Sequence, residues 1–367
     1  MKKIALYTLY GLFNFGNRLQ NYALQQSITS LGLKASTLVD KRLGRGFLIK
    51  NVAKLFLKRS NGKIRFKNLE DYAEEPRKYN FQKFNDKYIE MHRLHTSKIY
   101  FPSSVSDNFD FFVVGSDQVW NAEGWNGKYG LANWYNYTLQ FAPPEKRIAY
   151  AASFSINKLP CQWEKPFAEV LPQFKAISVR EETGAEIIRN LTGLEVPVVL
   201  DPTMLLTVSE WRKIETHTLE DTEKFILTYF LGPQSENIYR EIEKKASDLN
   251  LPVINLMDYK SKYYCSGPDR FLELVDRAEI VYTDSFHGTV FSILFHKQFY
   301  LYQRNLTLEG YSDMGSRLDT LLKKTQLTER VRNREMITEE DFKKADMLIE
   351  KEREASMQFL RDALNDR

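Results

Sequence analysis

Cysteine is scarce in this sequence. The 367 residues include only Cys161 and Cys265, and neither stands in a CxxC pair or near a histidine at a metal-ligand spacing. A disulfide framework needs several paired cysteines, and a structural zinc site needs clustered Cys and His ligands. We therefore expect no disulfide and no metal site. We also expect no bound cofactor.

Long apolar runs and a strong net charge are also missing. No apolar stretch reaches the ~18 residues that span a bilayer, and Gly11, Asn14 and Gly16 interrupt the apolar start of the chain before a signal peptide develops. The 52 Lys and Arg nearly balance the 48 Asp and Glu, so the net charge of +4 does not call for nucleic acid as a partner. With 43% hydrophobic and 27% charged residues, the composition predicts a folded cytoplasmic protein, an enzyme or a binding protein.

One stretch departs from this even charge distribution. From Lys41 to Lys67 the sequence interleaves cations with apolar residues such as Phe47 and Leu55. Such a stretch can be a basic flap that covers an anionic or lipid-linked substrate and makes peripheral contact with a membrane surface. The pattern favours the alternative, a solvated helix whose Lys and Arg stems cover an apolar stripe.

The order of apolar runs and polar loops predicts an α/β fold with two Rossmann-like domains, because domains usually hold about 100–200 residues and β-loop-α-β units build parallel sheets. The expected strands are 4–9, 35–39, 109–114, 147–151, 176–179 and 196–200, then 225–230, 253–256, 280–283 and 298–302. The expected helices are 19–31, 180–191, 235–249, 268–278 and 289–295, and a Trp- and Asn-rich tract at 120–134 is expected to be a structured loop.

The polar segment 207–224 is the expected linker between the domains. We therefore predict an N-terminal domain at 1–206 on the acceptor side and a C-terminal domain at 207–335 on the donor side. Residues 336–367 have an amphipathic helical pattern that suits a helix returning across the cleft to the N-terminal domain.

The loop Asp284-Ser285-Phe286-His287-Gly288 follows the expected strand at 280–283. A helix that begins near Gly288 would offer backbone N–H groups and its positive dipole end to a phosphate. His287 could bind that phosphate or move a proton near neutral pH. The alternative is a buried, hydrogen-bonded His287 and a Ser285 that only caps the helix.

Arginines stand at further strand ends and helix starts. Arg180 follows the strand at 176–179 and could hold a carboxylate or phosphate with two hydrogen bonds. It could also form an ion pair with Glu181 or Asp201. Arg304 and Arg317 are further cations near the last loops, with either a binding or a structural role.

Two other loops are rich in amides. Asn14, Asn17 and Gln20 follow the first strand, and Ser116, Asp117 and Gln118 follow the strand at 109–114. Amides donate and accept hydrogen bonds and so suit sugar hydroxyls, although the first loop can also be a glycine-relaxed turn with Asn17 capping the helix. Neither loop has the spacing of a dinucleotide fingerprint, a nucleophile elbow or a P-loop.

In this order and at these separations, the loops resemble the polysaccharide pyruvyl transferase family over about residues 2–325. The matching stretches are Asn14-Phe15-Gly16-Asn17, Gly115-Ser116-Asp117-Gln118, Ala151-Ala152-Ser153-Phe154, Ser178-Val179-Arg180-Glu181, Leu200-Asp201-Pro202-Thr203, Asp284-Ser285-Phe286-His287-Gly288 and Ser316-Arg317-Leu318. The resemblance implies a fold similar to that of GT-B glycosyltransferases. It also implies transfer of the enolpyruvyl skeleton from phosphoenolpyruvate to two hydroxyls of one sugar, which yields a pyruvate ketal and phosphate.

The resemblance also assigns roles. Arg180 and His287 fall on positions that hold the donor anion, beside Ser285 and Gly288. Family members often have Ser-Arg-Leu-His where this chain has Asp284-Ser285-Phe286-His287. An expected arginine is therefore missing at Ser285, and we look to Arg304 or Arg317 as its replacement.

On this interpretation His287 is the acid or the group that stabilises the leaving phosphate, and Asp117 or Asp284 accepts a hydroxyl proton. The acceptor sugar is expected to contact Asn14, Asn17, Gln20, Ser116 and Gln118. Its identity, its attachment to a lipid, the ketal stereochemistry and the oligomeric state stay open. Two alternatives also stay open: a GT-B glycosyltransferase with a nucleotide-sugar donor, and a catalytically silent sugar- or anion-binding member of a biosynthetic complex.

Overall fold

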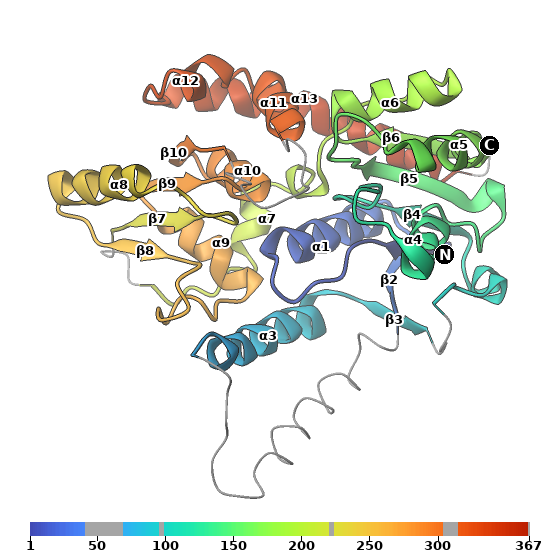
Figure 1. The fold of residues 1–367 in the computed structure, drawn as a ribbon, viewed down its shortest axis with the longest axis horizontal. Helices are drawn as coiled ribbons and strands as arrows, with labels where there is room; N and C mark the ends of the chain where they lie inside the picture. Colours follow the sequence, from blue (N-terminus) through green and yellow to red (C-terminus); the bar gives the residue numbers. More distant parts are fainter. Residues whose placement is uncertain (41–68, 95–98, 220–223, 304–314, 366–367) are drawn as a thin grey trace, which may run out of the picture.

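Two parallel β-sheets organise the computed structural model, which describes residues 1–40, 69–94, 99–219, 224–303 and 315–365 (Figure 1). The strand orders are β3-β2-β1-β4-β5-β6 and β10-β9-β7-β8. The first sheet holds β1 (Lys3–Tyr7), β2 (Lys34–Asp40), β3 (Met91–Leu94), β4 (Phe111–Val114), β5 (Arg147–Ala152) and β6 (Ala176–Val179). The second holds β7 (Ile226–Tyr229), β8 (Val253–Asn255), β9 (Ile280–Thr283) and β10 (Gln298–Leu301). This arrangement confirms the predicted α/β fold with two Rossmann-like sheets.

Helices connect the strands. They are α1 (Phe15–Ser30), α3 (Leu69–Tyr88), α4 (Gly127–Tyr137), α5 (Cys161–Val170), α6 (Glu182–Thr192), α7 (Val208–Arg212), α8 (Glu236–Leu249), α9 (Pro268–Arg277), α10 (Phe286–Leu294), α11 (Gly315–Thr325), α12 (Thr328–Arg332) and α13 (Glu339–Ala363). We call β1 to β6 with their helices the first domain, and β7 to β10 with α8 to α12 the second domain. None of the helices in the described ranges has both the length and the apolar character that a membrane crossing requires.

The central strands of the first sheet are buried on both faces. Ile4 and Leu6 join the apolar cluster that includes α1, whereas Ala5 between them joins the cluster that includes Trp120 and Trp163. Alternate residues of a strand point to opposite faces, so a sheet covered on both sides needs apolar residues at every position. The four buried residues of β4, Phe-Phe-Val-Val, meet this need.

The strand order fixes where polar loops gather. In the first sheet, successive strands are added on one side of β1 up to β3 and on its other side from β4 onwards. In the second sheet the same change of side occurs between β7 and β9. In open parallel sheets the crevice for ligands forms outside the carboxyl ends of the strands at this change of side. The loops after β1 and β4, and those after β7 and β9, are therefore the structural candidates for a site.

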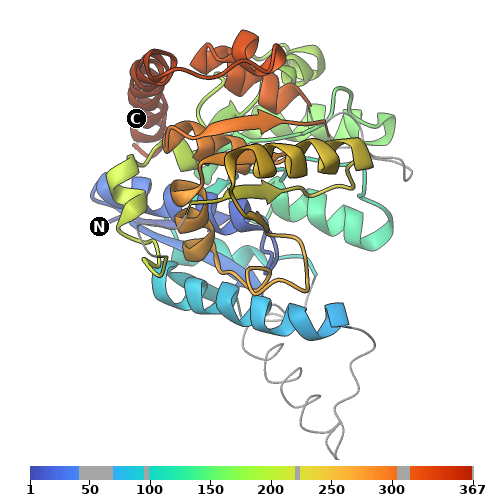
Figure 2. The same cartoon turned by 90° about the vertical axis from the view of Figure 1, so that its left-hand side faces the viewer.

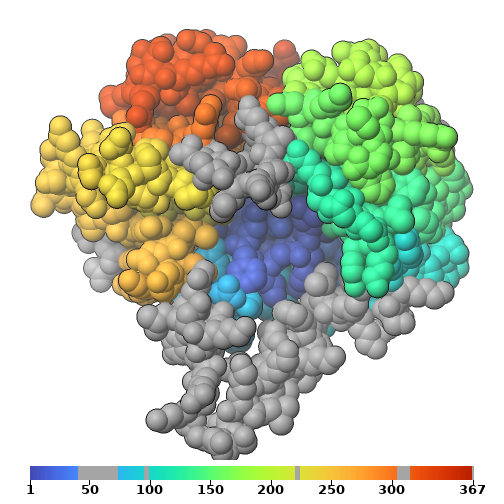
Figure 3. Space-filling view, viewed as in Figure 1, coloured from blue at the N-terminus to red at the C-terminus, as the bar shows by residue number. Residues whose placement is uncertain are grey.

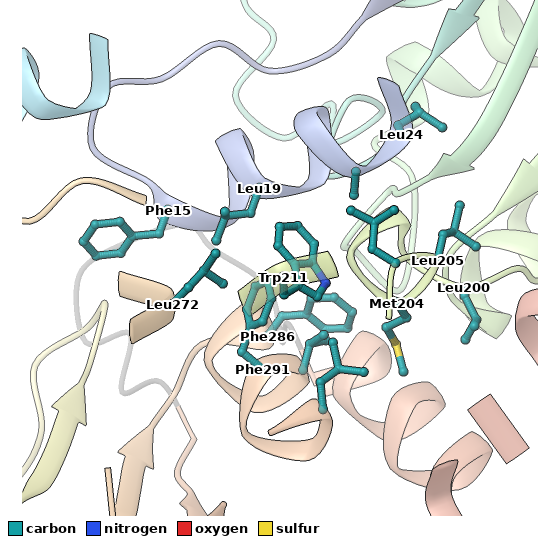
Figure 4. Packing of buried hydrophobic residues seen from close by; sticks show 14 of the residues in the cluster. Phe15, Leu19, Leu24, Leu200, Met204, Leu205, Trp211, Leu272, Phe286 and Phe291 are labelled. Carbon is teal, nitrogen blue, oxygen red and sulfur yellow. The ribbon is translucent and has the colours of Figure 1, made fainter. Parts of the chain in front are cut away.

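An apolar interface joins the two domains along α1. Figure 4 shows Phe15 and Leu19 of α1 facing Leu272, Trp211 and Phe286. The Phe15 ring stacks on the Phe271 ring at 4.7 Å, and the Trp211 ring meets the Phe291 ring edge-on at 5.1 Å. Because one continuous apolar cluster includes both sides, the two crevices are held close to each other.

Helix α13 contacts both domains. Near its start Phe342 stacks on His296 at 4.9 Å, and near its end the Ser356 hydroxyl accepts a hydrogen bond of 3.0 Å from the Leu200 amide. Lys2 Nζ donates to the Leu364 carbonyl at 3.1 Å, so the two chain ends lie near each other (Figure 2). The predicted return of the last helix to the first domain is confirmed.

Three predicted features need correction. The tract 120–134 is not only a loop, because α4 begins at Gly127 within it. Residues 196–200 form no strand but a single bridge between Val198 and Val179, since Pro197 has no amide hydrogen to donate to a strand ladder. Helix α10 begins at Phe286, three residues before the expected start, so His287 lies in its first turn.

Candidate functional site

The first turns of α1 and α10 meet between the two sheets. A Cβ atom added at Gly16 of α1 would overlap with the imidazole ring of His287 of α10. Only glycine leaves room for this contact. From outside, the N-terminal residues are visible in blue in the hollow between the domains (Figure 3).

Arg180 lies at the centre of the site, just after β6, and is 3% exposed. Its Nη1 donates to Asp201 at 2.6 Å and its Nη2 donates to Asp117 at 3.3 Å. The ion pair with Asp201, an alternative considered from the sequence, is therefore present together with a second pair. One guanidinium thus joins the loop after β4 to the loop that precedes α7.

The charges of this cluster shift the affinities of its groups for protons. Burial alone would raise the pKa of Asp201, but His287 and Arg180 outweigh it and hold the pKa far below its usual value. Burial also opposes the ionised form of Asp117, yet Arg180, His287 and Arg317 lower its pKa. Burial lowers the pKa of Arg180, and the facing carboxylates more than restore it. Both aspartates and Arg180 are therefore charged at neutral pH.

Arg317 of α11 reaches the same place from the second domain. Its Nη1 lies 3.9 Å from Asp117 Oδ1. The Gln118 side-chain amide is assigned so that its oxygen faces the surrounding donors. That oxygen then accepts hydrogen bonds from both terminal nitrogens of Arg317 at 3.0 and 3.2 Å. The guanidinium carbons of Arg180 and Arg317 lie 4.6 and 5.7 Å from the centre of the Phe286 ring, and the electron-rich face of an aromatic ring stabilises such cations.

His287 and Arg180 each carry a buried ring or guanidinium nitrogen that lacks a hydrogen-bond partner among the described residues. They are His287 Nε2 and Arg180 Nε. Asp201 Oδ1 lies 3.7 Å from His287 Nε2, beyond hydrogen-bond distance. Buried polar groups in native proteins are nearly always paired, so an orphaned group needs an explanation such as a ligand.

The rest of the Asp284 loop is engaged with the protein. The Asp284 carboxylate accepts hydrogen bonds from the amides of Leu231 and Gly232 at 2.7 and 2.9 Å, which ties together the loops after β9 and β7. The Ser285 hydroxyl accepts from the Gly288 amide at 3.3 Å as an N-cap. A Cβ atom at Gly288 would meet Thr283, so glycine is needed there for helix-to-strand packing. The capping role considered for Ser285 is what the structure shows.

The predicted sugar-binding amides are also engaged in hydrogen bonds within the protein. Asn14 caps α1 by accepting from the Asn17 amide at 3.2 Å, so the cap is Asn14 rather than Asn17. Asn17 Nδ2 instead donates to Asp117. Gln20 is fully buried and bridges the Thr8 hydroxyl at 2.8 Å and the Ser116 amide at 3.2 Å. The Ser116 hydroxyl donates to Asp201 at 3.0 Å.

Two predictions lie outside the described residues. They concern Arg304 and the basic segment from Lys41 to Lys67. Of the two proposed replacements for the missing arginine, Arg317 is the one that the structure places at the site.

Asp201 and Glu181 are site residues that our sequence analysis did not select. Asp201 holds Arg180, and it accepts from the Thr203 amide and hydroxyl at 3.0 and 2.7 Å. Glu181 Oε1 accepts from the Ser153 hydroxyl and from the Phe154 and Ser155 amides at 2.9 to 3.1 Å. Their position after β6 and before α7 was the available signal, but it does not distinguish an ion-pair partner from a ligand contact.

Fold and site thus define a two-domain α/β protein with a buried cluster of charged and polar groups where two loop crevices meet. The model of the polysaccharide pyruvyl transferase family matches residues 14–304. The chain belongs to this family. The match includes Arg180, Asp201 and His287, which make the central contacts.

Solved structures with similar folds have low sequence identity to the chain. UDP-GlcNAc 2-epimerase from Neisseria meningitidis, bound to UDP-GlcNAc, aligns with a TM-score of 0.44 and 11% identity over 99% of this chain and 100% of its own. MnaA from S. aureus, in a structure with UDP, aligns with a TM-score of 0.46 and 9% identity over 94% of this chain and 91% of its own. MurG from Acinetobacter baumannii aligns with a TM-score of 0.40 and 11% identity over 99% of each chain. No match to the chain was found among curated protein sequences.

Proposed function

We propose that the protein transfers the enolpyruvyl group of phosphoenolpyruvate to two hydroxyls of one sugar in a cell-surface polysaccharide or its precursor, and that it releases phosphate. The observation that carries this proposal is the pair of buried donors, Arg180 Nε and His287 Nε2, that lack a hydrogen-bond partner among the described residues. Phosphoenolpyruvate has a carboxylate and a phosphate, and both suit N–H donors of a guanidinium and an imidazole. Each donor comes from a different domain.

The first step of the proposed reaction joins the acceptor to the donor. A hydroxyl oxygen of the sugar bonds to C2 of phosphoenolpyruvate while a proton is added to the methylene carbon C3. His287 supplies that proton. If His287 instead stabilises the phosphate that leaves later, the proton of the attacking hydroxyl reaches C3 through a nearby carboxylate. The hydroxyl proton passes to a nearby carboxylate.

In the second step a neighbouring hydroxyl bonds to C2 and the bond from C2 to the phosphate oxygen breaks. Phosphate leaves with the electron pair of that bond and takes up the proton of the second hydroxyl. The product is a cyclic ketal of pyruvate. Atoms and charges balance without any oxidant or metal-dependent electron transfer.

Asp117 is the carboxylate that fits the role of base. Asp284 is held by two backbone amides, whereas Asp117 faces Arg180, Asn17 and Arg317 inside the site. When a donor anion binds at Arg180 Nε, its negative charge offsets part of the positive charge that Asp117 faces, and the pKa of Asp117 rises towards that of an ordinary carboxylate. Donor binding would thereby turn a weak base into a stronger one.

Entry of substrate requires movement at this site. Arg180, Arg317 and His287 are each at most 5% exposed, so a donor reaches them only when the domains separate or the side chains between them rearrange. Because the domains meet along an apolar interface at α1, we propose a small opening around α1 rather than a wide hinge motion. We place the reaction in the cytoplasm, where phosphoenolpyruvate is made.

Melting temperatures with candidate donors separate the alternatives. We expect phosphoenolpyruvate to raise the melting temperature in proportion to the logarithm of its concentration above Kd, and a panel of nucleotide sugars to have no effect. A shift with nucleotide sugars alone would instead favour a glycosyltransferase. A shift with phosphoenolpyruvate but no phosphate release with any sugar would indicate a silent binding protein.

Mass spectrometry then tests the chemistry. Polysaccharide fragments incubated with the protein and phosphoenolpyruvate should gain the mass of pyruvate less one water, with one phosphate released per modified sugar. A gain that corresponds to a whole sugar residue would contradict the proposal.

A further inference from the structure

A cavity of about 190 Å³ lies beside the charged cluster, at the carboxyl ends of β1 and β2. Seven of its lining residues have polar side-chain atoms: Tyr7, Thr8, Tyr10, Tyr129, Asn133, Asn136 and Tyr137. Pockets for drug-sized ligands measure roughly 300–1,000 Å³. The cavity therefore suits a ligand of about one ring.

The lining excludes the donor as occupant. None of the described side chains around the cavity is charged, whereas phosphoenolpyruvate needs cations to offset its phosphate and carboxylate. Tyrosine rings with hydroxyl and amide groups instead provide an apolar surface with a few hydrogen-bonding atoms. A neutral polyol with an apolar ring face, which is the chemistry of a pyranose, matches this lining.

Helix α4 presents the polar wall. Tyr129, Asn133 and Tyr137 are four residues apart and so lie along one helix face, and all three line the cavity. The Asn133 side chain makes no hydrogen bond to another described residue, and Tyr129 is 60% exposed at the rim. The neighbouring Asn136 is different, because both ends of its amide are bonded to the backbone of Phe101 and Ile99 at 3.0 and 2.8 Å.

The inner wall of the cavity connects with the charged cluster. Thr8 donates to the Ser116 carbonyl at 3.0 Å, and the Ser116 hydroxyl donates to Asp201. Tyr137 stacks on Tyr7 at 4.7 Å. Asp117 follows Ser116 directly in the chain, so a ring in the cavity would have its inner hydroxyls on the side of the charged cluster.

We propose that this cavity binds the sugar ring that receives the pyruvyl group, with the amide of Asn133 and the hydroxyl of Tyr129 as its specificity-determining contacts. The proposal rests on the proposed function only for the fate of the sugar. Binding of a neutral sugar ring at α4 stands separately from the donor chemistry.

Saturation-transfer NMR tests the binding directly. The probes are the methyl glycosides of glucose, galactose, mannose, N-acetylglucosamine and N-acetylmannosamine, each with the full-length protein. We expect at least one of them to show saturation transfer. The signal should fall at least fivefold in Asn133→Ala and in Tyr129→Ala and stay unchanged in Leu131→Ala, which alters an exposed residue of the same helix outside the cavity lining.

A second variant guards against indirect effects. Ala132→Leu fills the cavity from a buried lining position, and its melting temperature reports whether the fold survives. A folded Ala132→Leu protein should still show the melting shift with phosphoenolpyruvate but no saturation transfer from the sugar.

The outcomes keep the two proposals apart. Equal saturation transfer in the wild type and in all α4 variants, or none from any glycoside in the wild type, would overturn the cavity proposal. Sugar binding that depends on Asn133 but gives no phosphate release from phosphoenolpyruvate would leave the cavity proposal standing and contradict the proposed function.

Discussion

At the scale of single residues, the site depends on charges that are buried but almost completely paired. Arg180 contacts Asp201 and Asp117, and Glu181 is held by a hydroxyl and two backbone amides. Leaving any buried charge unpaired costs several kcal/mol. Because the pairing offsets this cost, polar loops, which usually stay at the surface, can meet inside the molecule here.

Replacing His287 tests the residue assigned to proton transfer. If the imidazole transfers a proton, His287→Ala should lower turnover by roughly 10²–10⁴-fold, measured as phosphate release. His296→Ala is the matched control, because His296 lies just beyond the other end of α10 and pairs with Asp346 at 2.9 Å. Near-normal turnover of the His287 variant would show that the assignment is wrong.

Glu215 provides a pH test outside the site. Burial, together with the Asp276 carboxylate, raises the pKa of Glu215 to about 7. The pKa of Glu215 in the folded state exceeds its unfolded value of about 4.3. The contribution of Glu215 to the free energy of unfolding is therefore complete below about pH 4 and is lost as the pH rises through about 7.

Glutamine does not ionise, so Glu215→Gln should escape this loss. We therefore expect the free energy of unfolding of Glu215→Gln, relative to that of the wild type, to be about 1–2 kcal/mol higher at pH 8 than at pH 5. Urea unfolding at both pH values measures the difference. Glu243→Gln, at an exposed position, is the control. A Glu215 variant that follows the wild-type pH dependence would contradict the raised pKa.

At the scale of helices and strands, the sequence predicted elements well where the apolar pattern was uninterrupted. The structure places β6 and β9 at the predicted residues. It also adds α3 and α4, where Pro76 and a run of Trp and Asn conceal the helical pattern. Position after a strand identified Arg180 and His287. It could not show whether an amide such as Gln20 would bond to protein or to ligand, because that depends on contacts between distant loops.

Gly16 tests the contact between the first turns of α1 and α10. A side chain at this position overlaps with the His287 ring, so Gly16→Ala must displace the imidazole or the helix. We expect a loss of about 1–3 kcal/mol in stability and up to about 10²-fold in turnover, since small misplacements of catalytic groups are costly.

Gly124→Ala is the matched control for this change. An added Cβ at Gly124 meets no atom within 4 Å, so stability and turnover should stay close to those of the wild type. Equal behaviour of the two variants would show that α1 and α10 do not approach each other as described.

At the scale of the whole molecule, one apolar cluster links both domains and α13 crosses between them. We propose that the domain boundary lies at the predicted position, between residues 206 and 207. Trp211 follows it, with its ring against Tyr22 and Phe291 and its Nε1 donating to the Thr203 carbonyl at 2.9 Å. This residue therefore joins parts of both domains.

Trp211→Ala should destabilise the protein by about 3–5 kcal/mol, as large-to-small changes in cores do. Because the ring contacts both domains, we expect one unfolding transition to move as a unit. Leu249→Ala, at a 44% exposed position, should change stability by no more than about 0.5 kcal/mol. A Trp211 variant with two separate transitions, only one of them shifted, would contradict the joint core.

The central claim is that Arg180 and His287, from different domains, hold one small anionic donor. A crystal structure of the protein with phosphoenolpyruvate and no acceptor tests it most directly. We predict phosphate or carboxylate oxygens of a single donor molecule at about 2.7–3.2 Å from both Arg180 Nε and His287 Nε2. A donor bound elsewhere, with these two nitrogens still lacking a ligand, would contradict the claim.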